Sequence, residues 1–245
     1  MPEYKMLPAG DTALVVEFGD HIERRLSSWV LALARRLTES RISGVVETVP
    51  TYRSLIVHFD PLVVSSASLM TRVVDLMRGL QLMQSIGRHW YLPACYDPAI
   101  APDLDDVAGR TGLSPAQVVD LHSSTTYHVY MLGFLPGMAY LGDVPAELGL
   151  PRRTTPRLHV PAGSLAIATT MTCVYPLDTP AGWHLIGRSP VPFWERRPVI
   201  KTLLAPGDRV TFSPVSLSEF EDLSAKAAAG ALHVEPVEET MEVAA

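Results

Sequence analysis

The stretch Gly133–Pro190 decides the fold of the second half of the chain and reads GFLPGMAYLGDVPAELGLPRRTTPRLHVPAGSLAIATTMTCVYPLDTPAGWHLIGRSP. It holds 8 of the chain's 21 prolines and 7 of its 16 glycines. Because proline fixes φ and glycine frees it, this density specifies a winding path with few alternatives. Aromatic and aliphatic residues accompany the turns, so the stretch predicts short strands and tight turns rather than a disordered linker.

Arginines lie among these turns. Arg152 and Arg153 follow one proline directly, and Arg157 follows another. The prolines restrict the guanidinium groups, whose forked donors match a carboxylate or a phosphate. The spacing alone favours a solvated loop with surface ion pairs over a ligand site. Arg157, with Arg152 as the second choice, is kept as a candidate ligand contact, which the family resemblance given below favours.

Four other residues are candidate ligand contacts. Arg188 stands beside a glycine in a β-rich turn and is expected to face the same ligand as Arg157. His122 ends a predicted helix, whose dipole favours the protonated imidazole, and a structural cap is the alternative. Thr172 and Tyr175 can donate hydrogen bonds to an amide or a carbonyl, with ordinary strand packing as the alternative. No candidate nucleophile has a base nearby in sequence and no metal-ligand spacing occurs, so no catalytic residue or metal is assigned.

Five motifs are linked within this stretch: GFLPG-x-x-YLG, PRR-x-TPR, VPAGS-x-AIA, T-x-x-YP and PAGW-x-LIGR-x-P. Together they resemble the KipI/PxpB family, also called the 5-oxoprolinase B subunit or allophanate hydrolase subunit 1. The resemblance extends to LHS at Leu121–Ser123 and to APGDRVTF at Ala205–Phe212. It implies a cyclophilin-like β-barrel in the second half of the chain.

The same resemblance implies the B subunit of an ATP-dependent 5-oxoprolinase, which opens the cyclic amide of 5-oxoproline to glutamate. The family's B subunit pairs with a homologous C subunit and joins a separate A subunit, so the chain alone is expected to be inactive. The phosphate-binding pattern G-x-x-x-x-G-K-[ST] is missing from the sequence, so ATP is expected to act through the assembled complex. Two alternatives stay open: a urea- or allophanate-type amide hydrolase or carboxyltransferase subunit, and a KipI-like inhibitor of a sensor histidine kinase.

One segment departs from the family pattern. Where the family typically has AGGQTG, this chain has ATTMTC at Ala168–Cys173. Two glycines are replaced by β-branched threonines, which predicts a more extended backbone because such residues avoid positive φ. A glutamine that can pair with an amide is replaced by Met171, which cannot. Met171 is therefore kept as a candidate substrate contact that shifts the preference for substrate.

Composition limits the other functions. The 245 residues carry a formal charge of −6, which gives no basic surface for nucleic acid. No run of 18 apolar residues and no secretory signal occur, so a cytoplasmic protein without a membrane segment is expected. The two cysteines, Cys95 and Cys173, are expected to be reduced thiols.

The periodicity predicts an α+β protein with a ferredoxin-like domain over residues 1–86, a β-barrel domain over 87–220, and a helical end with a flexible acidic tail over 221–245. The order strand, helix, strand, strand, helix, strand is the ferredoxin-like pattern. Its expected strands are Ala13–Phe18, Val45–Pro50, Ser54–Phe59 and Arg88–Tyr96, and its expected helices are Glu23–Ser40 and Ser65–Met83. Farther along, Ser114 with a proline next and Gln117 three residues on predicts a capped helix start.

Overall fold

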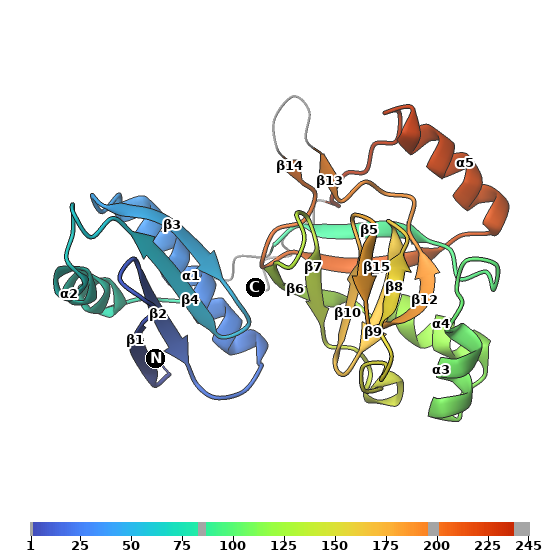
Figure 1. The fold of residues 1–245 in the computed structure, drawn as a ribbon, viewed down its shortest axis with the longest axis horizontal. Coiled ribbons are helices and arrows are strands. Elements are labelled where there is room, and N and C mark those ends of the chain that lie inside the picture. The colour runs from blue at the N-terminus through green and yellow to red at the C-terminus, as the bar shows by residue number, and fades with distance from the viewer. Residues whose placement is uncertain (1, 83–86, 196–200, 238–245) are drawn as a thin grey trace, which may run out of the picture. The chain divides into compact units, whose positions relative to one another are not determined.

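The computed structural model describes residues 2–82, 87–195 and 201–237. The chain forms two compact units, Met1–Ile86 and Gly87–Ala245. The first unit contains β1 (Tyr4–Pro8), β2 (Ala13–Phe18), α1 (Arg24–Ser40), β3 (Val45–Pro50), β4 (Ser54–Phe59) and α2 (Ser66–Met77). Its strands form one antiparallel sheet in the order β1-β2-β4-β3 (Figure 1).

Alternation along the strands of the first unit builds its core. Leu14 pairs with Val57 and Val16 pairs with Leu55, so the four side chains share one face of the sheet. This face packs against apolar residues of α1 and α2 in a single buried cluster. One strand differs from the prediction: β1 completes this sheet, whereas the strand expected over 88–96 belongs to the second unit.

The second unit contains a seven-stranded sheet and three α-helices among the residues described. Its elements are β5 (His89–Ala94), α3 (Leu104–Thr111), α4 (Pro115–Ser124), β6 (Tyr127–Leu132), β7 (Ala139–Gly142), η1 (Ala146–Leu148), β8 (Arg157–Val160), β9 (Ser164–Ala168), β10 (Met171–Val174), β11 (Thr179–Ala181), β12 (His184–Arg188), β13 (Trp194–Glu195), β14 (Lys201–Thr202), β15 (Arg209–Pro214) and α5 (Leu217–Ala228). The strand order of the large sheet is β12-β9-β10-β7-β6-β15-β5.

The two edges of this sheet meet just beyond β5. Cys95 N–H donates to the Arg188 carbonyl, and Arg188 N–H donates to the Cys95 carbonyl, both at 2.8 Å. This pair joins the end of β5 to β12 and nearly closes the sheet into a barrel. Gly187 permits the approach, because a Cβ there would lie 2.6 Å from the Cys95 carbonyl oxygen. The predicted α+β fold class is confirmed, with a four-stranded sheet followed by a barrel-like sheet.

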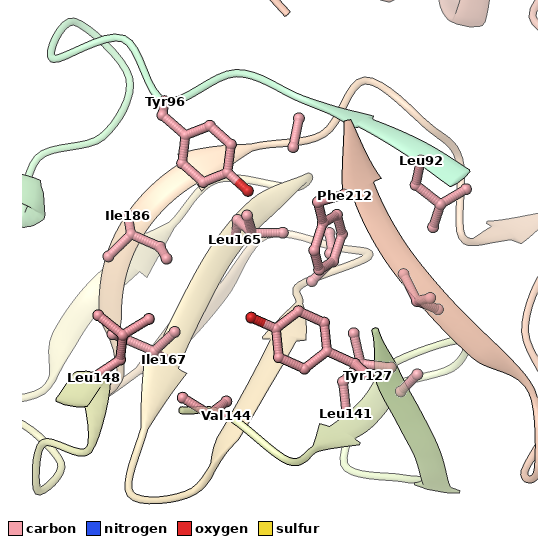
Figure 2. Packing of buried hydrophobic residues seen from close by; sticks show 14 of the residues in the cluster. Leu92, Tyr96, Tyr127, Leu141, Val144, Leu148, Leu165, Ile167, Ile186 and Phe212 are labelled. Atoms are coloured by element: carbon pink, nitrogen blue, oxygen red, sulfur yellow. The ribbon is translucent and has the colours of Figure 1, made fainter. Parts of the chain in front are cut away.

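Apolar side chains from every strand of the large sheet fill the barrel. Figure 2 shows Tyr96 and Tyr127 entering this core from different segments, with both hydroxyl groups inside it. The α3–α4 pair lies against the barrel, where α4 contacts β15 and α3 contacts β12. The capping box predicted at the start of α4 is confirmed, because the side chains and backbones of Ser114 and Gln117 bond reciprocally.

A buried carboxylate joins the start of the barrel to its end. The side chain of Asp208 is only 4% exposed. It accepts hydrogen bonds from five groups: Arg88 N, Arg88 Nε, Arg88 Nη2, Trp90 Nε1 and Ala205 N. Arg88 also lies over the Trp90 ring, 4.9 Å from its centroid. Asp208 therefore fixes the entry of β5 beside the turn that precedes β15.

The segment after α5 returns to the barrel. Leu232 and Val234 pack against the barrel core, and Val237 N–H donates to the His89 carbonyl at 2.8 Å. The sequence predicts a solvated tail here, whereas the part up to Val237 contacts the barrel. Residues 238–245 of the predicted tail lie outside the described residues.

Candidate functional site

Strand β10 separates two groups of predicted site residues. Thr172 and Val174 point into the barrel core, because Val174 belongs to the core cluster and Thr172 bonds to a core histidine. Since side chains alternate along a strand, Met171 and Cys173 point to the opposite, outer face. Tyr175 follows on that same outer face. Met171 and Tyr175 thus lie apart from Thr172, although all three are buried.

His122 lies on the core side of β10, in a chain of hydrogen bonds. The Tyr96 hydroxyl is 2.8 Å from His122 Nδ1, and His122 Nε2 is 2.9 Å from Thr172 Oγ1. Thr172 Oγ1 donates in turn to the Ala166 carbonyl at 3.0 Å. This direction fixes the others: Nε2 carries the proton and donates to Thr172, so Nδ1 accepts from Tyr96.

Burial keeps this imidazole neutral. No part of His122 is exposed, and its ring stacks on Phe212 at 5.2 Å between centroids. Loss of hydration lowers the pKa of His122 from 6.5 to about 3. The predicted protonated imidazole at the helix end is therefore wrong, because desolvation outweighs the modest attraction of the helix dipole. Both ring nitrogens are engaged within the core, so ligand contact by His122 stays a prediction that requires this core to open.

The second group surrounds a buried carboxylate at the start of α3. Asp103 is 3% exposed and accepts from Arg157 through two bonds, Nη1 to Oδ2 at 2.7 Å and Nη2 to Oδ1 at 2.6 Å. Arg153 Nη1 donates to Oδ1 at 2.9 Å, and the Leu185 backbone N–H donates to Oδ2 at 2.7 Å. The two arginines thus hold Asp103 with charge-assisted bonds. The Arg157 fork, which we expected to face a ligand, points to Asp103.

Arg152 stands between two backbone anchors. On one side His184 Nε2 donates to the Pro151 carbonyl at 2.9 Å, and on the other Arg153 N–H donates to the Gly182 carbonyl at 2.8 Å. The Arg152 side chain is exposed, and among the residues described it makes no hydrogen bond or ion pair. Of the three arginines in the PRR-x-TPR motif, Arg152 can therefore bind a carboxylate ligand without breaking an existing bond.

Aromatic residues of the outer face lie near Arg152. Tyr140 and Trp183 meet edge to face, with ring centroids 5.9 Å apart. Burial raises the pKa of Tyr140 and of Tyr175, and the positive charge of Arg152 opposes the rise for both hydroxyls. Both phenols are therefore protonated at neutral pH. Arg152 places an exposed cation beside Tyr140 and Tyr175, whose hydroxyl bonds to Cys173, and we take this outer face as the candidate site.

Burial also decides the chemistry that Cys173 can perform on this face. The thiol is fully buried, and desolvation raises its pKa well above that of a free cysteine. A protonated thiol is a poor nucleophile. Among the residues described, no cluster of three or more His, Cys, Asp or Glu side chains can hold a metal ion. The exposed Arg152 cation on this face can pair with an anion, and among the residues described no activated nucleophile lies there.

Arg188 has partners of its own. Its Nη2 donates to the Ala162 carbonyl at 2.7 Å, and its guanidinium carbon lies 5.7 Å from the centroid of the Phe220 ring. Asp178, an exposed side chain, accepts from the Ala162 N–H at 2.7 Å. Arg188 thus supports the turn before β9, while Arg157 bonds to Asp103, and a shared ligand contact of these two arginines stays a prediction.

Residues 4–204 match the family described as carboxyltransferase domain, subdomain C and D. The chain belongs to this family. It is 34% identical to the 5-oxoprolinase B subunit of Bacillus subtilis over 231 residues, which cover 89% of this chain and 95% of that protein. It is 38% identical to the Escherichia coli O157:H7 protein of the same name, over 84% of this chain and 93% of that protein. The predicted resemblance is thereby confirmed.

A solved structure shows the same fold at low identity. The crystal structure of the Kluyveromyces lactis urea amidolyase superposes with a TM-score of 0.80 at 20% identity, over 97% of this chain and 16% of that one. Every candidate site residue lies inside the carboxyltransferase domain match, whereas β15 and α5 lie beyond it. No described helix combines the length and apolar character that a membrane crossing requires.

A surface depression lies elsewhere on this carboxyltransferase domain. Its volume is about 570 Å³, and it lies over α4. It is lined by Leu113, Gln117, Asp120, Leu121, Ser123 and Ser124. None of the predicted site residues is among them, so the depression gives no support to a single hollow shared by the arginines.

The expected extension of the backbone at the departing segment is wrong at Thr169. Thr169 has φ of 53°, in the left-handed region, because Thr169 and Thr170 form a two-residue connection between β9 and β10. Such a connection requires positive φ, and the paired strands impose it even on a β-branched residue. Thr169 N–H donates to the Leu150 carbonyl at 2.5 Å, which holds the turn against the segment leading to Arg152.

Thr169→Gly is therefore expected to stabilise the barrel by about 0.5–1 kcal/mol. Left-handed φ costs a residue with a Cβ about 1–2 kcal/mol, and the greater freedom of unfolded glycine cancels about half of the gain. Thr170→Gly is the matched control and should destabilise, since Thr170 has no positive φ to relieve. Urea unfolding of both variants measures this, and a loss of stability in both would contradict the assignment.

The sequence did not single out Asp103, Tyr140 or Trp183 as functional residues. Asp103 reads as an ordinary helix cap, and Tyr140 and Trp183 read as ordinary core residues. Their partners lie tens of residues away, so no local spacing reveals them. A weak signal existed: Trp183 and Tyr140 both stand inside the family motifs.

Proposed function

We propose that this chain is the B subunit of an ATP-dependent 5-oxoprolinase, acting with a homologous C subunit and an A subunit. The observation that carries the proposal is identity of 34–38% to proteins named as 5-oxoprolinase B subunits, over nearly the whole length of those proteins. The naming of these relatives as B subunits itself indicates an enzyme of several subunits.

The geometry of the outer face supports a compact anionic amide as substrate. Arg152 would hold the carboxylate of 5-oxoproline, because its fork is unengaged among the described residues and its backbone is anchored on both sides. The hydroxyl of Tyr175, which bonds to Cys173 in this structure, would turn to the lactam carbonyl and make the carbonyl carbon more electrophilic. Water then adds at that carbon, the C–N bond breaks, and the released nitrogen takes a proton to give glutamate.

ATP is assigned to the assembled complex. The sequence has no P-loop pattern. The part of this chain in the reaction is to bind and orient the substrate, and the nucleotide chemistry belongs to its partners.

Reconstitution tests the proposal. The three subunits are purified together, and loss of 5-oxoproline is measured with and without ATP and with this chain omitted. ATP-dependent consumption that requires this chain is expected. A complete complex that leaves 5-oxoproline untouched but consumes urea or allophanate would assign the chain to the other amide class, and consumption of neither would refute an amide-opening role.

Arg152→Ala is expected to raise KM for 5-oxoproline by about 10–100-fold. A charge-assisted hydrogen bond of about 1.5–3 kcal/mol is lost, and kcat changes little because Arg152 holds the ground state as well as the transition state. Arg152→Lys should recover part of the affinity. The control is Arg78→Ala in the first unit, where the arginine is 77% exposed and pairs with Asp75. Unchanged KM in Arg152→Ala would remove Arg152 from the site.

A further inference from the structure

Asp103 occupies the N-cap position of α3 but does not cap it. Its φ is −111° and its side chain makes no cap hydrogen bond. Aspartate is among the preferred N-cap residues, because its oxygen satisfies an otherwise unpaired helix amide. Here both oxygens are instead engaged by Arg153, Arg157 and Leu185 N–H. The carboxylate therefore stabilises the segment that carries Arg153 and Arg157, and it does not cap its own helix.

The bonds of Asp103 fix the segment around Arg152 in space. Asp103 joins the start of α3 to Arg153 beside Arg152, to Arg157 at the start of β8, and to Leu185 in β12. Asp103 N–H also donates to the Leu185 carbonyl at 3.0 Å, so the two backbones are locked together. Because β12 also carries the His184 that anchors Pro151, the segment around Arg152 is held by His184 on one side and through Arg153 by Asp103 on the other.

We propose that Asp103 is a positioning residue, which preorganises Arg152 for the substrate carboxylate by holding the two neighbouring arginines of the same loop. This inference rests on the proposed function. A long side chain on a free loop loses more freedom on binding than one whose backbone is already fixed. Asp103 also engages Arg157 through both of its Nη atoms and Arg153 through Nη1, which leaves Arg152 as the arginine of this motif that is open to the carboxylate of the substrate.

A double-mutant cycle tests whether Asp103 acts through Arg152. Asp103→Asn keeps the shape but weakens both ion pairs, and it is expected to raise KM for 5-oxoproline by about tenfold with kcat within about twofold. In the Arg152→Ala background the same change should alter KM less than about twofold, since the residue to be positioned is gone. Asp105→Asn is the control, because this exposed carboxylate on the same helix undergoes the same loss of charge.

Folding of each variant is checked by thermal unfolding, and assays are run well below the transition. If Asp103→Asn does not fold, Arg153→Lys replaces it in the cycle, since this variant keeps the charge and loses the planar fork; it should raise KM about threefold, again only when Arg152 is present. Effects that persist in the Arg152→Ala background would assign Asp103 a purely structural role and overturn the inference. In that outcome an active wild-type complex still supports the proposed function, whereas an inactive wild-type complex refutes the function itself.

Discussion

Asp208→Ala is expected to lower the free energy of unfolding of the barrel unit by about 3–5 kcal/mol. The carboxylate is buried and accepts from Arg88, Trp90 Nε1 and the Ala205 amide. Removing it leaves a buried indole N–H and two backbone amides without their acceptor, which costs far more than a surface ion pair. The loss comes from these orphaned donors, since Arg88 itself is half exposed and can turn to water.

Urea unfolding followed by tryptophan fluorescence measures this loss. Asp120→Ala is the control, because this exposed aspartate on α4 also removes one negative charge from the same unit. Arg88→Gln should cost much less than Asp208→Ala, because the Trp90 and Ala205 bonds remain. If Arg88→Gln and Asp208→Ala were equally destabilising, the ion pair and not the buried acceptor would be the source of stability.

Acid is expected to destabilise the barrel through His122. The pKa of His122 is about 3 in the folded chain and about 6.5 when unfolded, so the unfolded state takes up the proton first. The stability that this histidine contributes is complete above pH 6.5 and falls by about 1.4 kcal/mol per pH unit as the pH drops toward 3. Between pH 6.5 and 4.5 the loss is about 2–3 kcal/mol.

The difference between wild type and a variant isolates this effect from other acidic groups. His122→Gln removes the titrating ring, so its unfolding free energy should be lower at pH 7 but should decline less steeply below pH 6.5. His159→Gln is the control, because it removes an exposed histidine and leaves the buried ring of His122 in place. Equal slopes for wild type and His122→Gln would show that the buried ring takes up no proton on unfolding in this range.

Helices and strands that are determined by neighbouring residues could be predicted from the sequence. The capped start of α4 follows from Ser114, a proline and Gln117 within four residues. The helices and strands of the first unit follow from hydrophobic periodicity, apart from β1, whose short run ends in a proline. These features need no knowledge of distant parts of the chain.

The roles of the candidate site residues could not be predicted, because each role is decided by a hydrogen-bond partner that lies far away in the sequence. Arg157 and Arg152 look alike in sequence, and only the position of Asp103, 54 residues from Arg157, shows which of them is engaged. The same distance effect explains His122, whose neutral state follows from Tyr96 and Thr172 on other elements. The prediction of an extended backbone is wrong at Thr169 for a different reason. The hairpin between β9 and β10 imposes a positive φ there, which threonine by itself disfavours.

The parallel pairing of β5 with β15 has a consequence for how the chain acquires its structure. Arg88 and Asp208 are 120 residues apart, and β5 finds its sheet partner only when the end of the barrel has been made. The first unit completes its sheet within the first 59 residues. During synthesis the small sheet can therefore assemble early, while β5 must wait with its apolar face uncovered, and closing so long a loop makes the barrel the slower unit to form.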